Sequence, residues 1–182
     1  MFLELANIFI AVAAFLSFLQ FLIPLFFLRK KANSINTCVP FLASLSFFLL
    51  SVSFFILVLS FIDSDFSVQN VWANSHTSKP LLYKISGSWG NHEGSMLLWC
   101  WVMSLYGFLV SLNFQKLSYN FKIRILMFQG ALCFGFVSFL FFGSNPFVRL
   151  SPIPLEGVGL NPLLQDPGLA FHPPFLYLGY VG

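Results

Sequence analysis

Three histidines are the side chains of this sequence best suited to hold a metal ion or a cofactor. They are His76, His92 and His172, and imidazole is the commonest metal-binding side chain in proteins. The three cysteines stand far apart, and their spacing fits neither a metal site nor a disulfide framework. The chemistry to consider is therefore ligation by imidazole, and we identify no candidate catalytic nucleophile or base.

His172 precedes two consecutive prolines, Pro173 and Pro174, near the start of an apolar run over residues 169–182. A residue before proline is disfavoured in helical geometry, and proline is favoured at the first position of a helix. We therefore expect His172 at or near a helix N-cap, at the membrane surface. This placement fits a surface histidine that caps a helix, and it also fits an iron or metal ligand. The helix N-terminus beside it would also favour an anionic group such as a propionate.

A second candidate segment, residues 88–95 with the sequence SWGNHEGS, stands just before an apolar run. Glu93 lies near the positive end of the expected helix, where a carboxylate is stabilised by about 0.3–1 kcal/mol. Trp89 fits the aromatic belt of a membrane interface. His92 and Glu93 are sequence neighbours and point apart on a helix, which argues against a shared metal site. A helix-entry turn is therefore preferred here over direct ligation by His92.

Two further polar positions are interpreted without a ligand. His76 lies in the sequence NSHT and is expected to be a solvated loop residue. Asp166 opens the Asp-Pro-Gly sequence of residues 166–168, which is typical of a turn that positions the following helix.

The composition indicates a membrane protein. Of the 182 residues, 58% are apolar and 8% are charged, and the mean hydropathy is +0.84. Soluble domains are about 45–50% apolar and about 25% charged, so this chain has too few charges for a soluble surface. Aromatic residues make up 19%, which excludes intrinsic disorder. The net charge of +3 is small and scattered, which argues against a nucleic-acid partner.

Four apolar runs are long enough to cross a bilayer, which takes about 20 residues. They cover residues 5–28, 39–62, 95–112 and 125–142. A partial fifth run, 169–182, would be about 21 Å long as a helix against a hydrocarbon core of about 30 Å, so it ends inside the membrane or a partner completes it. The sequence therefore predicts an all-α, polytopic transmembrane bundle that forms a single membrane domain over 1–182.

The basic residues predict how this bundle is oriented. Six of the nine follow the first and third runs: Arg29, Lys30, Lys31, Lys116, Lys122 and Arg124. The positive-inside rule places these two segments on the inner side. The N-terminus, the long loops 63–94 and 143–168, and all three histidines then lie on the outer side. The four predicted spans contain no carboxylate and no histidine, which gives little support to a proton path or a transporter.

Several motifs outside the spans match one family. They include VWANS at 71–75, WGNHEGS at 89–95, LNPLLQDPGL at 160–169, FHPP at 171–174 and LYLGYVG at 176–182. In this order they resemble the N-terminal part of the CcmF family, the haem lyase subunits of the cytochrome c maturation system. The resemblance covers the chain from about residue 60 to its end, whereas the first two spans match in hydropathy alone.

The resemblance implies a role with haem as the cofactor. Members of the family receive haem from the chaperone CcmE and help attach it to apocytochrome c through thioether bonds. The histidine of the family's His-Pro-Pro motif is an axial ligand of the haem iron, which carries over to His172. The cofactor-binding set implied by the resemblance is His172, Trp89, His92, Glu93, Asp166, Pro173 and Pro174.

The chain also departs from the family pattern. The tryptophan-rich WWD segment, the second outer histidine and the histidines for a haem b are absent from the sequence. We therefore expect a fragment or a split subunit, incomplete as a lyase alone, which assembles with a C-terminal CcmF-like partner. Its richness in Phe, Ser and Asn points to the mitochondrial inner membrane with loops toward the intermembrane space, or, in a bacterium, to the cytoplasmic membrane with loops toward the periplasm. The competing interpretations are a structural assembly subunit without haem contact and a haem or small-molecule transporter.

Overall fold

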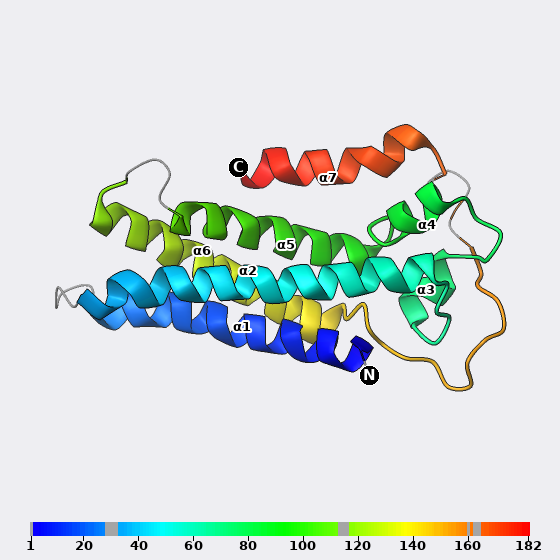
Figure 1. The fold of residues 1–182 in the computed structure, drawn as a ribbon, viewed down its shortest axis with the longest axis horizontal. Coiled ribbons are helices and arrows are strands. Elements are labelled where there is room, and N and C mark those ends of the chain that lie inside the picture. Colours follow the sequence, from blue (N-terminus) through cyan, green and yellow to red (C-terminus); the bar gives the residue numbers. More distant parts are fainter. Residues whose placement is uncertain (1, 28–32, 113–116, 160, 162–164) are drawn as a thin grey trace.

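The computed structural model describes residues 2–27, 33–112, 117–159, 161 and 165–182. Four long helices dominate this part of the chain: α1 (Phe2–Phe27), α2 (Asn33–Ile62), α5 (His92–Ser111) and α6 (Tyr119–Gly143). All four are long and apolar enough to cross a membrane. They pack side by side (Figure 1), and the prediction of an all-α transmembrane bundle is confirmed.

All four helices begin earlier than their apolar runs, α1 at Phe2. α2 begins at Asn33 and contains Pro40, and α5 begins at His92 because Asn91 caps it, its side chain accepting the Gly94 N–H at 2.7 Å. α6 begins at Tyr119 and includes Lys122, whose ammonium donates to the Ser111 carbonyl at 2.7 Å. Polar first turns are stabilised by such local bonds, which hydropathy does not register.

The loop 63–94 is more ordered than the sequence predicts, because it holds two short helices, α3 (Gln69–Asn74) and α4 (Leu81–Gly87). An antiparallel bridge joins it to the second long loop: the Gln69 N–H donates to Val148 at 2.9 Å, and Leu150 donates to Ser67 at 2.8 Å. Farther along, the Val158 N–H donates to the Trp72 carbonyl at 2.8 Å. The two loops therefore form one layer, residues 63–91 and 144–159, which we call the loop end of the bundle.

Figure 1 places the loop end, the first turn of α1 and the start of α7 (Pro167–Val181) at the same end of the bundle. The last turns of α1 and α5 and the first turns of α2 and α6 lie at the opposite end. α7 lies along one flank, beside α5. The expected grouping of the N-terminus with both long loops is thus present in the fold.

The centre of the bundle is apolar, with fully buried residues such as Leu50, Leu57 and Phe61. One polar contact interrupts it. The Gln20 amide donates to Gln129 Oε1 at 2.5 Å and to the Leu126 carbonyl at 2.7 Å. Gln129 donates to the Met103 carbonyl at 3.1 Å, so the pair links α1, α5 and α6. The two glutamines bond each other and the backbone, which satisfies their polar groups inside the apolar bundle.

Candidate functional site

α7 carries the candidate ligand His172, and the helix begins five residues before it, at Pro167. The Ala170 N–H donates to the Asp166 carbonyl at 2.9 Å, so the Asp-Pro-Gly sequence forms the entry to the helix. The expectation that His172 lies at an N-cap is therefore wrong. Proline is favoured at the first helical position, and Pro167 takes that position ahead of Pro173 and Pro174.

The two inner prolines leave a carbonyl of α7 for another donor. Pro174 has no N–H, so the Ala170 carbonyl lacks the donor that a regular helix would supply four residues later. The indole N–H of Trp89 donates to this carbonyl at 2.8 Å. Ala170 is buried, 3% exposed. Trp89, from the turn between α4 and α5, thereby anchors the first half of α7 on the bundle.

Two side chains of α5 anchor the second half of α7. The rings of Trp99 and Tyr177 lie 5.1 Å apart between centroids, and the Tyr106 hydroxyl donates to the Leu178 carbonyl at 2.9 Å. Trp99 also stacks on Phe136 of α6, at 5.8 Å. Together with Trp89, these contacts fix which face of α7 meets the bundle.

His172 lies on the other face of α7. At 3.6 residues per turn, Ala170 and Tyr177 fall on one side of the helix, and His172 is rotated by about 200° from Ala170. Its imidazole is exposed. The neighbouring Phe171 and Phe175 are 52% and 69% exposed. The exposed imidazole between exposed aromatic rings could hold a metal ion or a planar cofactor that reaches it from outside the four-helix bundle.

His92 is oriented toward α6. Its Nδ1 lies 2.8 Å from the hydroxyl of Ser144, the residue that follows α6. Glu93 occupies the first turn of α5, as expected. The structure thus connects Trp89 to α7 but gives His92 a partner on α6, and it shows no hydrogen bond from the side chains of His92 or Glu93 to α7 within the described ranges. Those ranges also hold no group of three or more His, Cys, Asp or Glu side chains placed to bind a metal ion.

His76 is on the surface, yet it belongs to a cluster that joins the two long loops. Its Nδ1 lies 2.9 Å from the Ser78 hydroxyl and 3.8 Å from a carboxylate oxygen of Glu156. Glu156 accepts from the Thr77 hydroxyl at 2.7 Å and the Thr77 N–H at 3.0 Å. These bonds from Thr77 lower the pKa of Glu156. The expectation of a solvated loop histidine did not foresee this cluster, because Glu156 stands 79 positions from Thr77 in the sequence.

Comparison with known proteins gives the family. Residues 89–182 match the family model described as cytochrome C assembly protein. The chain belongs to this family. The chain is 44% identical over 182 residues, all of its length, to the cytochrome c-type biogenesis protein CycK of Rhizobium meliloti. It is 49% identical over 123 residues, 67% of its length, to the cytochrome c-type biogenesis protein CcmF of Escherichia coli.

The segment that matches the family model contains the turn with Trp89 and all of α5, α6 and α7. A solved structure named cytochrome c heme lyase CcmF has the same fold, with a TM-score of 0.71 over 99% of this chain at 22% identity. The chain spans about a fifth to a quarter of the length of these proteins: 27% of CycK, 19% of the Escherichia coli CcmF and 27% of the solved chain. The resemblance inferred from the motifs is confirmed.

Proposed function

We propose that this chain is part of a cytochrome c haem lyase and holds haem through His172 on the outer face of the membrane. The observation that carries the proposal is the orientation of α7: Trp89 and Tyr177 bind one face to the bundle, and the exposed imidazole stands on the other. The family membership and the names of the relatives support a role in cytochrome c maturation.

Each residue then has a physical task. Haem, when bound, supplies the vinyl groups that form thioethers with the thiols of an acceptor apocytochrome. The His172 imidazole would hold the iron, and the exposed rings of Phe171 and Phe175 would contact the porphyrin. Trp89 would keep α7 fixed through the Ala170 carbonyl, and a fixed ligand favours productive geometry. His92 and Glu93 would shape the entry of α5, and Asp166 would shape the entry of α7. Pro173 and Pro174 lie inside α7, where Pro174 would leave the Ala170 carbonyl to the Trp89 donor.

The proposal includes partners and a compartment. A C-terminal CcmF-like subunit, or the rest of a longer chain with the WWD segment, would supply the second axial ligand, because relatives are about four times longer. The chaperone CcmE would deliver haem, and apocytochrome c would accept it. The loop end lies opposite the first turns of α6, which carry Lys122 and Arg124. This arrangement supports loops facing the intermembrane space of a mitochondrion, or the periplasm of a bacterium.

The deciding experiment replaces His172 with alanine in the purified assembly. We expect loss of most of the bound haem, or a shifted Soret band if the partner's ligand retains it, while the assembly stays intact. His76→Ala is the matched control, because it removes a surface histidine that lies in the loop end and not on α7, and it should leave the spectrum unchanged. An unchanged haem content and spectrum in His172→Ala would instead support a structural assembly subunit.

A further inference from the structure

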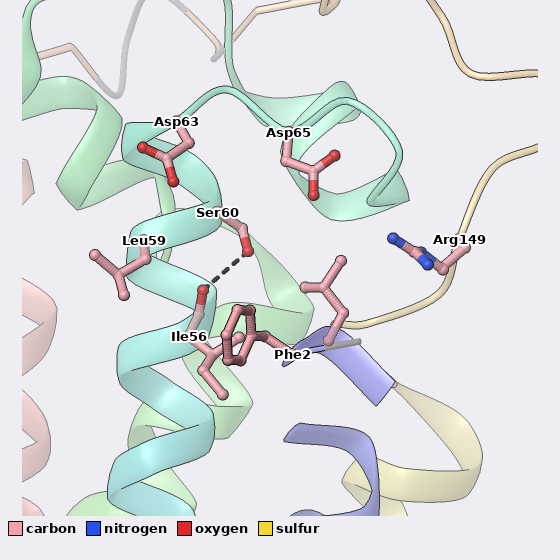
Figure 2. A pocket seen from close by; sticks show the side chains of 8 residues that line it. Phe2, Ile56, Leu59, Ser60, Asp63, Asp65 and Arg149 are labelled. Atoms are coloured by element: carbon pink, nitrogen blue, oxygen red, sulfur yellow. Dashed lines mark hydrogen bonds between the residues drawn. The ribbon is translucent and has the colours of Figure 1, made fainter. Parts of the chain in front are cut away.

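A separate hollow opens where α1 and α2 meet the loop end (Figure 2). Its volume is about 590 Å³, and it is lined by residues of α1 and α2, by two aspartates after α2 and by one arginine of the second long loop. None of these residues belongs to the candidate haem set. The lining residues are Phe2, Leu3, Ile56, Leu59, Ser60, Asp63, Asp65 and Arg149.

The rim of this hollow carries charges of both signs. Asp65 accepts the Ser67 N–H and hydroxyl at 3.1 and 2.6 Å, so one of its oxygens is occupied. The Asp63 carboxylate makes no hydrogen bond or ion pair with any part of the chain that the structure describes. Arg149 lies 3.2 Å from Glu4 and 3.3 Å from the Ser67 hydroxyl. A guanidinium has five donors, so Arg149 keeps donors for a further anionic group.

The floor of the hollow is apolar and belongs to the membrane-spanning helices. Phe2, Ile56 and Leu59 lie within the membrane-spanning parts of α1 and α2, and the span of α2 ends at Ile62, directly before Asp63. Figure 2 shows Phe2 and Ile56 on one side of the space, with Asp63, Asp65 and Arg149 around the other. The hollow therefore extends from the level of the lipid acyl chains to the level of the lipid headgroups.

We infer that this hollow binds a zwitterionic phospholipid with a primary amine, of the phosphatidylethanolamine class. The phosphate meets Arg149, the ammonium donates to Asp63, and one acyl chain lies against Phe2, Ile56 and Leu59. A trimethylammonium headgroup has no N–H to donate, so phosphatidylcholine fits less well. The two aspartates on the rim also disfavour a lipid with net negative charge. This site is distinct from the proposed haem function.

The test uses the full chain in nanodiscs that contain equal amounts of phosphatidylethanolamine and phosphatidylcholine with identical acyl chains. Native mass spectrometry then measures which lipid stays bound after partial delipidation. We expect about a threefold preference for phosphatidylethanolamine, the size typical of one exposed charge pair. Asp63→Asn should abolish the preference while total lipid retention persists. Arg149→Gln should lower the retention of both lipids.

Glu156→Gln is the matched control, because it removes one carboxylate of the loop end that lies outside the hollow; the preference should persist. Excess soluble phosphoethanolamine should leave the lipid bound, since it lacks the acyl chains that the floor contacts. The inference is overturned if the wild-type chain shows no preference, if Asp63→Asn keeps it, or if phosphoethanolamine displaces the lipid. Circular dichroism of each variant verifies that the helices are retained.

Discussion

The four-helix bundle and α7 are held in place by different means. Within the bundle, apolar side chains such as Leu50, Leu57 and Phe61 are completely buried between helices. Of the α7 side chains that the structure describes, Ala170 alone is buried, and the helix is held through Trp89, Trp99 and Tyr106 on one side. The bundle is thus stabilised by many contacts, whereas the element with the candidate ligand depends on a few aromatic side chains.

The difference bears on function. A peripheral helix with one bound face leaves its other face for a cofactor and a partner, and His172 stands on that face. The bundle contributes the positions of Trp89 and α5, and these decide where α7 lies. Variants that disturb the junction between the two regions should therefore affect α7 more than variants of equal size deep within the bundle.

The largest effect is expected at the start of α5, where Gly94 passes close to the turn that carries Trp89. A methyl group at this position would lie 1.8 Å from the Ser88 carbonyl oxygen, a backbone atom that cannot move aside. Gly94→Ala should destabilise the protein by about 3 kcal/mol, the upper range of overpacking. Thermal unfolding in detergent measures this change.

The control is Gly135→Ala, within α6, where an added methyl group meets nothing within 4 Å. Alanine is a better helix former than glycine, so this variant should be neutral or more stable by about 0.5–1 kcal/mol. Equal unfolding temperatures for the two variants would contradict the close approach of Gly94 to Ser88.

The next effect is expected from Trp89→Phe, which keeps a ring but removes the N–H that binds α7. The buried Ala170 carbonyl would lose its donor, at a cost of about 1–3 kcal/mol to the docking of α7. Hydrogen–deuterium exchange of the amides of α7 should become faster.

Trp101→Phe is the matched control, because the Trp101 indole donates to the Ser51 hydroxyl at 2.8 Å inside the bundle. It should leave the exchange of α7 unchanged. If the amides of α7 exchange at the same rate in both variants, the bond from Trp89 does not hold α7.

A smaller effect is expected from the polar pair inside the bundle. Gln20→Leu would remove the donor to Gln129 and the Leu126 carbonyl, and interhelical bonds of this kind contribute about 0.6–2 kcal/mol. Thermal unfolding of Gln20→Leu, Gln129→Leu and the double variant gives the coupling between the two side chains.

We expect the double variant to be less destabilised than the sum of the single variants. Haem binding should stay as in the wild type, because the pair lies between α1, α5 and α6 and not on α7. If the two destabilisations add, the two amides act independently of each other. That result would favour the competing interpretation of a transporter, in which polar side chains line a path across the membrane.

The smallest effect concerns pH at the loop end. Burial lowers the pKa of Lys79 from its usual 10.5 to about 8, and its ammonium donates to the Asn74 carbonyl at 3.0 Å. Between pH 8 and 10.5 the unfolded chain binds more protons than the folded chain, so stability should rise with pH across this window.

Lys79→Met should remove this rise, and denaturant titrations at pH 8 and pH 10 measure it. Lys84→Met is the control, because Lys84 is a second lysine of the loop end that donates to the Ser64 hydroxyl at 2.8 Å. If stability still rises with pH in Lys79→Met, another titrating group causes the rise.

The sequence allowed most of the membrane helices to be predicted but few of the contacts of the site. The apolar runs located the spans, because backbone polar groups in a bilayer must bond within a helix. The polar first turns of α5 and α6 were missed, since bonds such as that from Gly94 to Asn91 do not affect hydropathy. The prolines after His172 suggested a helix start there, whereas Pro167 begins the helix.

The sequence by itself determined the class of the protein, its four spans, the shared end of its two long loops and, through short motifs, its family. Those features depend on composition, charge and local order, which are properties of neighbouring residues. The tertiary structure alone decided that Trp89 bonds Ala170, that His92 turns to Ser144, and that Asp63 and Arg149 share a hollow. These pairs are separated by 52 to 86 positions in the chain, and only the packing of the helices brings them together.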